Sequence, residues 1–480
     1  MADPITFRAV VISSLLLVAA GCADVPREAG FADVKQNVSE RTGLEVRWNQ
    51  GTEADKAVEA RVAEMLRSEL SAEQAVQIAL LNNRHLQATY EDLMIAQADL
   101  VAAGLLRNPV FDGNIRFSTT GGGTAVELAL VQDFIDLLYI PLRQRIAGSE
   151  FAAAKLRVTG AVLDLAGETR TAFFSMQASQ QMLELRRQVL AATDASYDIA
   201  KRLRAAGNTR ELDLFTEQAL FERSKLDVRA AEAQTVRHRE RLNRMMGLWG
   251  TPAAEWKVAG RLPDLPDAPA DVGLADGLES RAVERSLDLQ LRRQKIEAAS
   301  QTLGLAAPYG LLSEVSLGVI ADRDNDGSWG VGPAFSLPIP LFDQGQPAVA
   351  KAQAELRRAH QRYAAIAVDV RSRTREACEA VIAAHEQADY HRKVILPLRQ
   401  KIVDQTQLQY NAMQASPLQL VDARQQQIDA GAGYVRAVRD YWLARAELDQ
   451  LLLGRMPAAD DTNANDNEGS AAPAGGRGGH

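Results

Sequence analysis

The fold is decided at residues 334–346, AFSLPIPLFDQGQ, where two kinds of secondary structure meet. Apolar side chains alternate with other residues up to Ile339, as they do in a strand, but Pro338 and Pro340 interrupt the hydrogen bonding of a strand. From Gln346 on, the chain is rich in Ala, Gln, Glu, Arg and Leu, a composition that favours a very long helix. This segment therefore predicts a strand that ends and passes directly into a helix.

The composition is that of a folded, helix-rich protein. Of the 480 residues, 46 % are hydrophobic, 5 % aromatic and 24 % charged, and the net charge is −8. An acidic chain without a basic patch argues against nucleic acid as a partner. The sequence has no run of eighteen uncharged apolar residues, so we expect no transmembrane helix in the mature chain.

The N-terminus has the pattern of an export signal. Arg8 precedes the short apolar run AVVISSLLLVAA, which ends at Gly21–Cys22. AAGC resembles the lipobox of bacterial lipoproteins, although Ala19 stands where Leu is usual. This resemblance implies a signal peptide over 1–21 and a lipid on Cys22. The alternative is an ordinary signal peptide with an incidental cysteine. The inner-membrane retention signal is absent, because Ala23 follows the cysteine.

The chain contains an internal repeat. Residues 75–104 align without gaps on 278–307, and residues 205–234 parallel 412–441. We assign a first repeat to 71–250, a Pro-rich linker to 251–273 and a second repeat to 274–456. Each repeat is predicted to contain a helix, two short strands, a very long helix, a turn and a shorter helix.

Two helices are predicted to be unusually long. No proline occurs between Arg143 and Ala206, and a helix of that length would measure roughly 95 Å. Its counterpart runs from about 346 to 413, with a kink or break at Pro397. A coiled-coil seam is predicted in the first helix, with members three and four residues apart. The predicted seam residues are Ala178, Met182, Leu185, Val189, Ala192, Ser196, Ile199 and Leu203.

Four strands are predicted, at 110–119, 125–134, 312–321 and 328–339. Each has about the length of a tilted strand that crosses a bilayer. Aromatic residues lie toward the strand ends, as in an interfacial girdle: Phe111, Phe117, Phe134, Tyr309, Trp329, Phe335 and Phe342. Four strands cannot close a barrel, and open sheet edges are not tolerated in lipid. If these strands lie in a membrane, several chains must share one barrel.

The two repeats, EQAVQIALLNN at 73–83 and GPAFSLPIPLFDQGQPAVAKAQAEL at 332–356, together resemble the outer-membrane channel family typified by TolC. The resemblance covers nearly all of 71–454. It implies a mainly α fold with a membrane β-barrel, in which a homotrimer builds a 12-stranded barrel in outer-membrane lipid and a long helical barrel across the periplasm. Lipoprotein members of this family serve as the exit duct for an inner-membrane pump and a periplasmic adaptor.

The resemblance also implies roles for residues at the two helical tips. Asp213 matches an acid at the channel entrance, and Tyr410 and Asp422 match gate positions. Gln419 and Ala415 stand where the best-known member has an acid and a basic residue, so the same salt-bridge latch is not expected. Solvated acids at helix starts are the alternative for Asp213 and Asp422.

The turn residues of the tips have a second implied role. Gly207, Asn208, Ser416 and Pro417 have ordinary turn chemistry, and tips of this kind are where an adaptor would dock.

No pattern of catalytic or metal-binding residues is recognisable. DRDNDG at 322–327 begins like a calcium loop, but Pro333 occupies the twelfth position, where Glu is needed. The six histidines form no ligand cluster, and no nucleophile–base pair is evident. We therefore expect no enzyme, no metal and no cofactor other than the lipid. Cys378 is expected to be a small helix residue that is buried or half-buried.

The flanks and the function leave alternatives open. Residues 22–70 are predicted to start a helix and then to wrap the outside as an extended segment, and 457–480 to be a disordered tail. Efflux of drugs or metal ions by a tripartite system is the leading function. A channel for type I protein secretion and a soluble periplasmic coiled-coil adaptor or scaffold are the alternatives.

Overall fold

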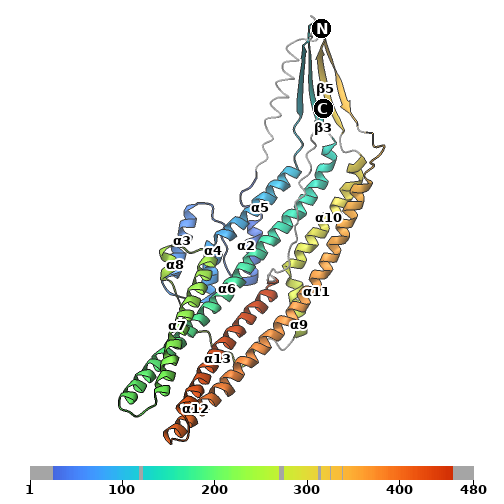
Figure 1. The fold of residues 1–480 in the computed structure, drawn as a ribbon. Coiled ribbons are helices and arrows are strands. Elements are labelled where there is room, and N and C mark those ends of the chain that lie inside the picture. The colour runs from blue at the N-terminus through green and yellow to red at the C-terminus, as the bar shows by residue number, and fades with distance from the viewer. Residues whose placement is uncertain are drawn as a thin grey trace.

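The computed structural model describes residues 25–117, 123–133, 135–269, 275–311, 315–324, 326–337 and 339–457. The predicted signal peptide, Cys22, Phe134, Pro338 and the tail from residue 458 lie outside this part of the chain. Figure 1 shows an elongated molecule with a small sheet at one end and two helical hairpins at the other. None of the described helices is long and apolar enough to cross a membrane.

The predicted repeat is confirmed, and each leading helix is divided into two. The first repeat contains α4 (Ala72–Asn82), α5 (Arg84–Ala103), β2 (Val110–Phe117), β3 (Thr124–Asp133), α6 (Asp136–Ala205) and α7 (Glu211–Met246). The second contains α9 (Ala275–Arg285), α10 (Leu287–Leu311), β5 (Ser316–Arg323), β6 (Trp329–Ser336), α11 (Gln346–Tyr390), η1 (His391–Ile395), α12 (Leu396–Asn411) and α13 (Pro417–Leu452).

The division of the leading helix has the same cause in both repeats. Asn83 and Ser286 occupy equivalent positions, and each accepts a hydrogen bond from the backbone N–H three residues on, at 2.9 Å and 3.2 Å. A side chain that caps a helix N-terminus in this way starts a new helix. The leading helix therefore ends and restarts at the same place in each repeat.

Two equivalent glycines let the end of the last helix of each repeat pack closely against this break in the leading helix. Gly247 and Gly454 follow α7 and α13 with φ of 66° and 94°. A Cβ atom on Gly247 would lie 2.5 Å from the Asn82 carbonyl oxygen, and one on Gly454 would lie 2.1 Å from that of Arg285. Only glycine tolerates both this backbone conformation and this close approach.

The Gly454→Ala variant is expected to lose about 2–5 kcal/mol of stability. The left-handed conformation costs a side chain about 1–2 kcal/mol, and the overlap with the Arg285 carbonyl oxygen adds about 1–3 kcal/mol. Thermal unfolding in detergent measures the loss. Gly260→Ala is the control, because a Cβ atom there would meet nothing within 4 Å. Equal melting temperatures for the two variants would contradict the close approach.

The long helices follow the sequence prediction except at their ends. α6 begins before the predicted Arg143 and contains Pro141, so this proline did not prevent helix formation. The second long helix is interrupted as predicted: α11 passes into the π-helical turn η1, and Pro397 is the second residue of α12. Proline lacks the N–H that an α-helix needs, which explains a departure from α geometry directly before it.

The predicted coiled-coil seam is wrong at its far end. Ala192, Ile199 and Leu203 are exposed in the chain. Instead, Thr193 donates to Ser224 of α7 at 3.0 Å, and the Tyr197 ring stacks on a ring of α7. A straight α-helix drifts about 20° per heptad relative to a strict seven-residue repeat, and the contact face moves with it.

The four longer strands form one antiparallel sheet in the order β2-β3-β5-β6. The register of the β5–β6 ladder shows where the two strands begin and end. Ser316 pairs with Ser336 at one end, and Arg323 pairs with Trp329 at the other. β5 therefore begins later than the predicted residue 312, and β6 ends earlier than the predicted residue 339. Residues 312–314 lie outside the described part of the chain.

The N-terminal segment and the linker are more structured than predicted. α2 (Phe31–Thr42) and the extended chain after it agree with the prediction, but α3 (Glu53–Met65) was missed. The linker forms α8 (Thr251–Glu255) and β4 (Lys257–Val258), which pairs with β1 (Glu69–Leu70). Trp256 is 1 % exposed and donates to Asn243 at 2.7 Å. The segment 251–269 therefore belongs to the core around α7 and α13. Cys378 is buried on α11, as predicted.

Candidate functional site

The sheet has two chemically different faces. Because successive side chains point to opposite faces, the register assigns each residue to one of them. One face is mainly apolar, and its polar residues are Thr124, Gln132 and Arg323. On β2 and β3 it carries Phe111, Ile115, Phe117, Val126, Leu128 and Leu130. On β5 and β6 the same face carries Leu317, Val319, Ala321, Trp329, Val331 and Phe335.

The opposite face is more polar and carries many small residues, together with Val110, Val131 and Ile320. Its most polar row joins Asn114, Glu127 and Asp322 across β2, β3 and β5, and the next strand contributes Gly330. Arg116 lies on this face and pairs with Glu127 at 3.3 Å. The sheet therefore offers one face suited to lipid and one suited to water.

Exposed aromatic rings lie at two levels of the apolar face. Phe117 and Trp329 are at the hairpin ends of their strands, and Phe111 and Phe335 are toward the helices. Phe342 follows β6 and is also exposed. These positions agree with the predicted girdle. Phe134 and the side chain of Tyr309 lie outside the described atoms.

The β5–β6 loop is a polar hairpin. The Gly327 N–H donates to the Asp324 carbonyl at 2.9 Å, and the Ser328 hydroxyl donates to Asp326 at 2.6 Å. Hydrogen bonds from the side chain and the backbone N–H of Ser328 lower the pKa of Asp326. Among the described residues, no group of three or more His, Cys, Asp or Glu could hold a metal ion.

The first helical tip joins α6 to α7, and its side chains hydrogen-bond the Asp213 carboxylate. Arg210 donates to both carboxylate oxygens of Asp213, at 3.1 Å and 3.0 Å, and Thr209 donates at 3.4 Å. The hydrogen bond from Arg210 lowers the pKa of Asp213. Asp213 is therefore paired and ionised within its own tip, rather than solvated as a simple helix-start acid.

The second tip joins α12 to α13 and is built differently. Ser416 and Gln419 form a reciprocal capping box, in which the Gln419 side chain accepts from the Ser416 N–H at 2.8 Å. Asp422 accepts from Gln426 of its own helix at 2.8 Å, and Tyr410 is partly exposed. The structure thus brings Ser416 and Gln419 together, and it shows Asp422 bonded within its helix.

The two tips also differ at the residue with positive φ. Gly207 occupies this position in the first tip with φ 76°, and Met413 occupies it in the second with φ 58°. The Met413 side chain is 95 % exposed. A non-glycine residue in this conformation stores strain, and such strain is concentrated at functional sites. Composition and spacing gave no signal for this position, because it is set by backbone geometry.

Met413→Gly is expected to relieve this strain and to stabilise the tip locally by about 0.5–1 kcal/mol. Hydrogen exchange of the 408–418 backbone amides measures the effect, and exchange should slow severalfold. Gln414→Gly is the control, because Gln414 is not among the residues with positive φ. Slower exchange in the control as well would show that the effect is unrelated to φ.

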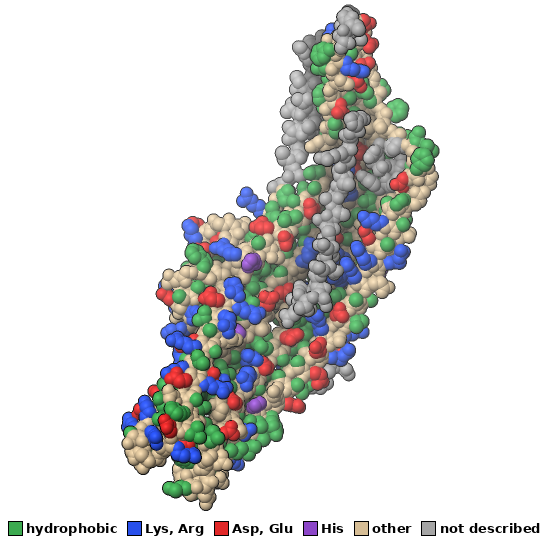
Figure 2. All heavy atoms as spheres, viewed as in Figure 1, with side chains coloured by type: hydrophobic (Ala, Val, Ile, Leu, Met, Phe, Trp, Pro, Cys, Tyr) green, Lys and Arg blue, Asp and Glu red, His purple; other side chains and the backbone are tan. Residues whose placement is uncertain are grey.

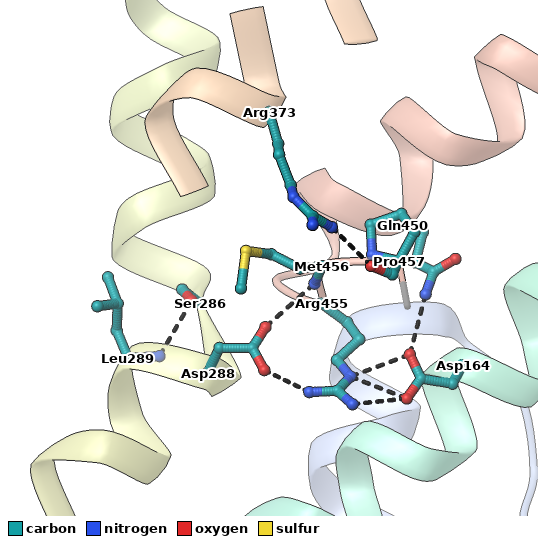
Figure 3. Close-up of polar contacts among 9 residues, drawn as sticks. All are labelled: Asp164, Ser286, Asp288, Leu289, Arg373, Gln450, Arg455, Met456 and Pro457. Carbon is teal, nitrogen blue, oxygen red and sulfur yellow. Dashed lines mark hydrogen bonds and ion pairs between the residues drawn. The ribbon is translucent and has the colours of Figure 1, made fainter. Parts of the chain in front are cut away.

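A buried ionic cluster joins the two repeats at mid-length (Figure 3). Arg455, just beyond α13, lies 2.7 Å from Asp164 of α6 and also pairs with Asp288 of α10. Gln450 donates to Asp164 at 3.0 Å, and the Met456 N–H donates to Asp288 at 3.1 Å. Burial raises the pKa of Asp164 despite the arginine. Because Arg455 pairs with both carboxylates and each carboxylate accepts a further hydrogen bond, this cluster ties the two repeats together.

The fold and the two-faced sheet define a class: an elongated protein that combines a short sheet for an apolar environment with long helices for an aqueous one. Comparisons with known proteins show what the chain is similar to. Residues 75–248 match the family described as outer membrane efflux protein. The chain is 26 % identical to outer membrane protein OprJ of Pseudomonas aeruginosa over 341 residues, which cover 64 % of this chain and 68 % of OprJ.

Solved structures share the fold. The Campylobacter jejuni CmeC outer membrane channel aligns with a TM-score of 0.68 at 17 % identity, covering 81 % of this chain and 87 % of CmeC. The outer membrane protein VceC of Vibrio cholerae aligns with a TM-score of 0.65 at 15 % identity, covering 80 % and 96 %. The chain is therefore similar to outer membrane efflux proteins over residues 75–248, and it shares its fold with solved outer membrane channels.

Proposed function

We propose that the protein is the outer-membrane channel of a tripartite efflux system and that it works as a homotrimer. The observation that carries this proposal is the four-stranded sheet with an apolar face, a polar face and two free edges, β2 and β6. Open edges are not tolerated in lipid. Three copies placed edge to edge would close a barrel of twelve strands with the apolar face outward.

The helices would continue the barrel as a tunnel across the periplasm. Each strand pair leads into long helices that run side by side away from the sheet (Figure 1). Solutes would pass through this tunnel, driven by an inner-membrane pump to which a periplasmic adaptor connects the channel. The proposed channel would supply no chemical step, and the family that residues 75–248 match is described as outer membrane efflux protein.

The tips would form the periplasmic entrance. Asp213, Tyr410 and Asp422 are the proposed gate residues, and each has a different environment in the chain. The amide of Gln419 is committed to its capping box, so Gln419 would shape the tip rather than latch it. The turns at Gly207, Asn208, Ser416 and Pro417 would receive the adaptor. Beside them, Leu212 and Leu418 are exposed at equivalent positions and would add apolar contact.

A lipid on Cys22 would anchor each protomer in the inner leaflet of the outer membrane. This part of the proposal rests on the AAGC sequence alone. The lipid would be an anchor and would play no part in transport. Mass spectrometry of the mature N-terminal peptide tests it, and an unmodified Cys22 in the mature chain would contradict it.

The oligomer and its location test the proposed function. Membranes are separated, the protein is solubilised in detergent, and its mass is measured. A trimer from the outer-membrane fraction is the expected result. A monomer in the soluble periplasm would contradict a shared barrel and would favour the adaptor or scaffold alternative.

The transported substrate separates efflux from protein secretion. A strain that lacks the gene is expected to become sensitive to at least one metal, dye or antibiotic. Normal tolerance to all of them, together with a protein missing from the culture medium, would instead indicate type I secretion.

A further inference from the structure

A groove with an excess of basic side chains lies where α6, α10 and α11 run side by side. It has a volume of about 220 Å³. Its charged residues are Arg292 and Lys295 of α10, Arg358, Arg362 and Glu355 of α11, and Glu150 of α6. Four basic and two acidic groups leave the groove with an excess of two positive charges, although the whole chain carries −8. Figure 2 shows Lys and Arg side chains gathered where α10 and α11 meet.

Three of the four basic groups have no ionic partner within the groove. Among the described residues, Arg292, Lys295 and Arg358 enter no ion pair with the carboxylates. By contrast, Arg455 and Arg143 are each paired with aspartate. Like charges held close together repel unless an opposite charge neutralises them. The groove is therefore arranged to receive a negative group.

A second groove on the other side of α6 and α10 shows which face of the helical wall the basic groove occupies. Arg293 of α10 and Lys155 of α6 line this second groove, whose other wall is α2. At 100° per residue, Arg293 points 100° away from Arg292 and 200° away from Lys295. The basic groove and α2 thus lie on opposite faces of a wall that is one helix thick.

An open channel requires that additional elements such as α2 pack on the outside of the wall. On that requirement, which rests on the proposed function, Arg292, Lys295, Arg358 and Arg362 line the lumen. They lie between the buried ionic cluster and the sheet, because α10 runs from Asp288 toward β5. Three copies would place an excess of six positive charges at one level of the tunnel.

We infer that this groove is a luminal binding site for anionic groups, and that it biases the channel toward solutes that carry negative charge. A ring of one sign of charge in a water-filled pore raises the local concentration of the opposite ion. Carboxylate, sulfonate and phosphate groups share the chemistry that paired guanidinium and ammonium groups recognise.

The test measures ion selectivity of the full-length protein in planar lipid bilayers under a KCl gradient. The double variant Arg292→Gln/Lys295→Gln is expected to lower the ratio of chloride to potassium permeability by about two- to fivefold. The matched comparison is between Arg292→Gln and Arg293→Gln, which remove the same charge from adjacent residues that line different grooves. Arg292→Gln should shift the reversal potential toward cation selectivity, and Arg293→Gln should leave it unchanged.

The outcomes separate this inference from the proposed function. If the unmodified protein forms no ion-conducting pore, the proposed function fails and the inference fails with it. If it forms a pore whose permeability ratio is the same in the double variant, or if Arg293→Gln shifts selectivity as much as Arg292→Gln, the luminal anion site is wrong while the channel stands.

Discussion

Leu128→Arg is expected to abolish assembly of the trimer in the outer membrane. Leu128 lies midway along β3, and its cross-strand neighbours on the apolar face are Gly113 and Ala321. An arginine on the lipid face of a membrane barrel costs about 2–4 kcal/mol near the midplane. The cost is incurred once in each of three protomers. The amount of trimer in the outer-membrane fraction, resolved by electrophoresis without heating, measures the loss.

Ala129→Arg is the matched control for this prediction. Ala129 is the neighbouring residue and lies on the polar face, opposite Asp112. An arginine there would enter the water-filled interior beside an acid, so trimer yield should remain near that of the unmodified protein. If both variants assembled equally well, or if Ala129→Arg were the more damaging, the assignment of the two faces would be reversed or wrong.

Arg455→Met is expected to cost about 3–5 kcal/mol of stability. The substitution removes the only basic partner that the structure shows for Asp164 and Asp288, and it leaves two carboxylates close together and largely buried. Burial already raises the pKa of Asp164 with the arginine present. A fall in the thermal unfolding temperature in detergent measures the effect.

Two further variants separate charge from packing at this cluster. Arg439→Met removes an exposed pair with Asp440 and should cost less than about 1 kcal/mol. Arg455→Met combined with Asp164→Leu and Asp288→Leu should recover much of the loss, because a buried ionic cluster replaced as a whole by apolar side chains is often neutral. A triple variant as unstable as Arg455→Met alone would show that shape rather than charge dominates.

The sequence by itself determined the repeat, the order of elements and the passage from strand to helix. These features depend on local chemistry: strand alternation, the prolines after β6, and long proline-free segments whose residues favour helix. The break before Pro397 was predictable for the same reason, since a missing N–H acts on the neighbouring turn. The resemblance placed candidate gate residues in the tips, and the structure finds all of them at or near those turns.

Only the tertiary structure decided which surfaces of these elements face each other. Trp256 lies in a Pro-rich segment and carries an indole N–H that needs a hydrogen-bond acceptor. It is buried because Asn243 of α7 accepts that hydrogen bond. The faces of the sheet and of α10 follow from register and from the position of α2. Such assignments depend on contacts between segments far apart in the chain, and local propensity carries no information about them.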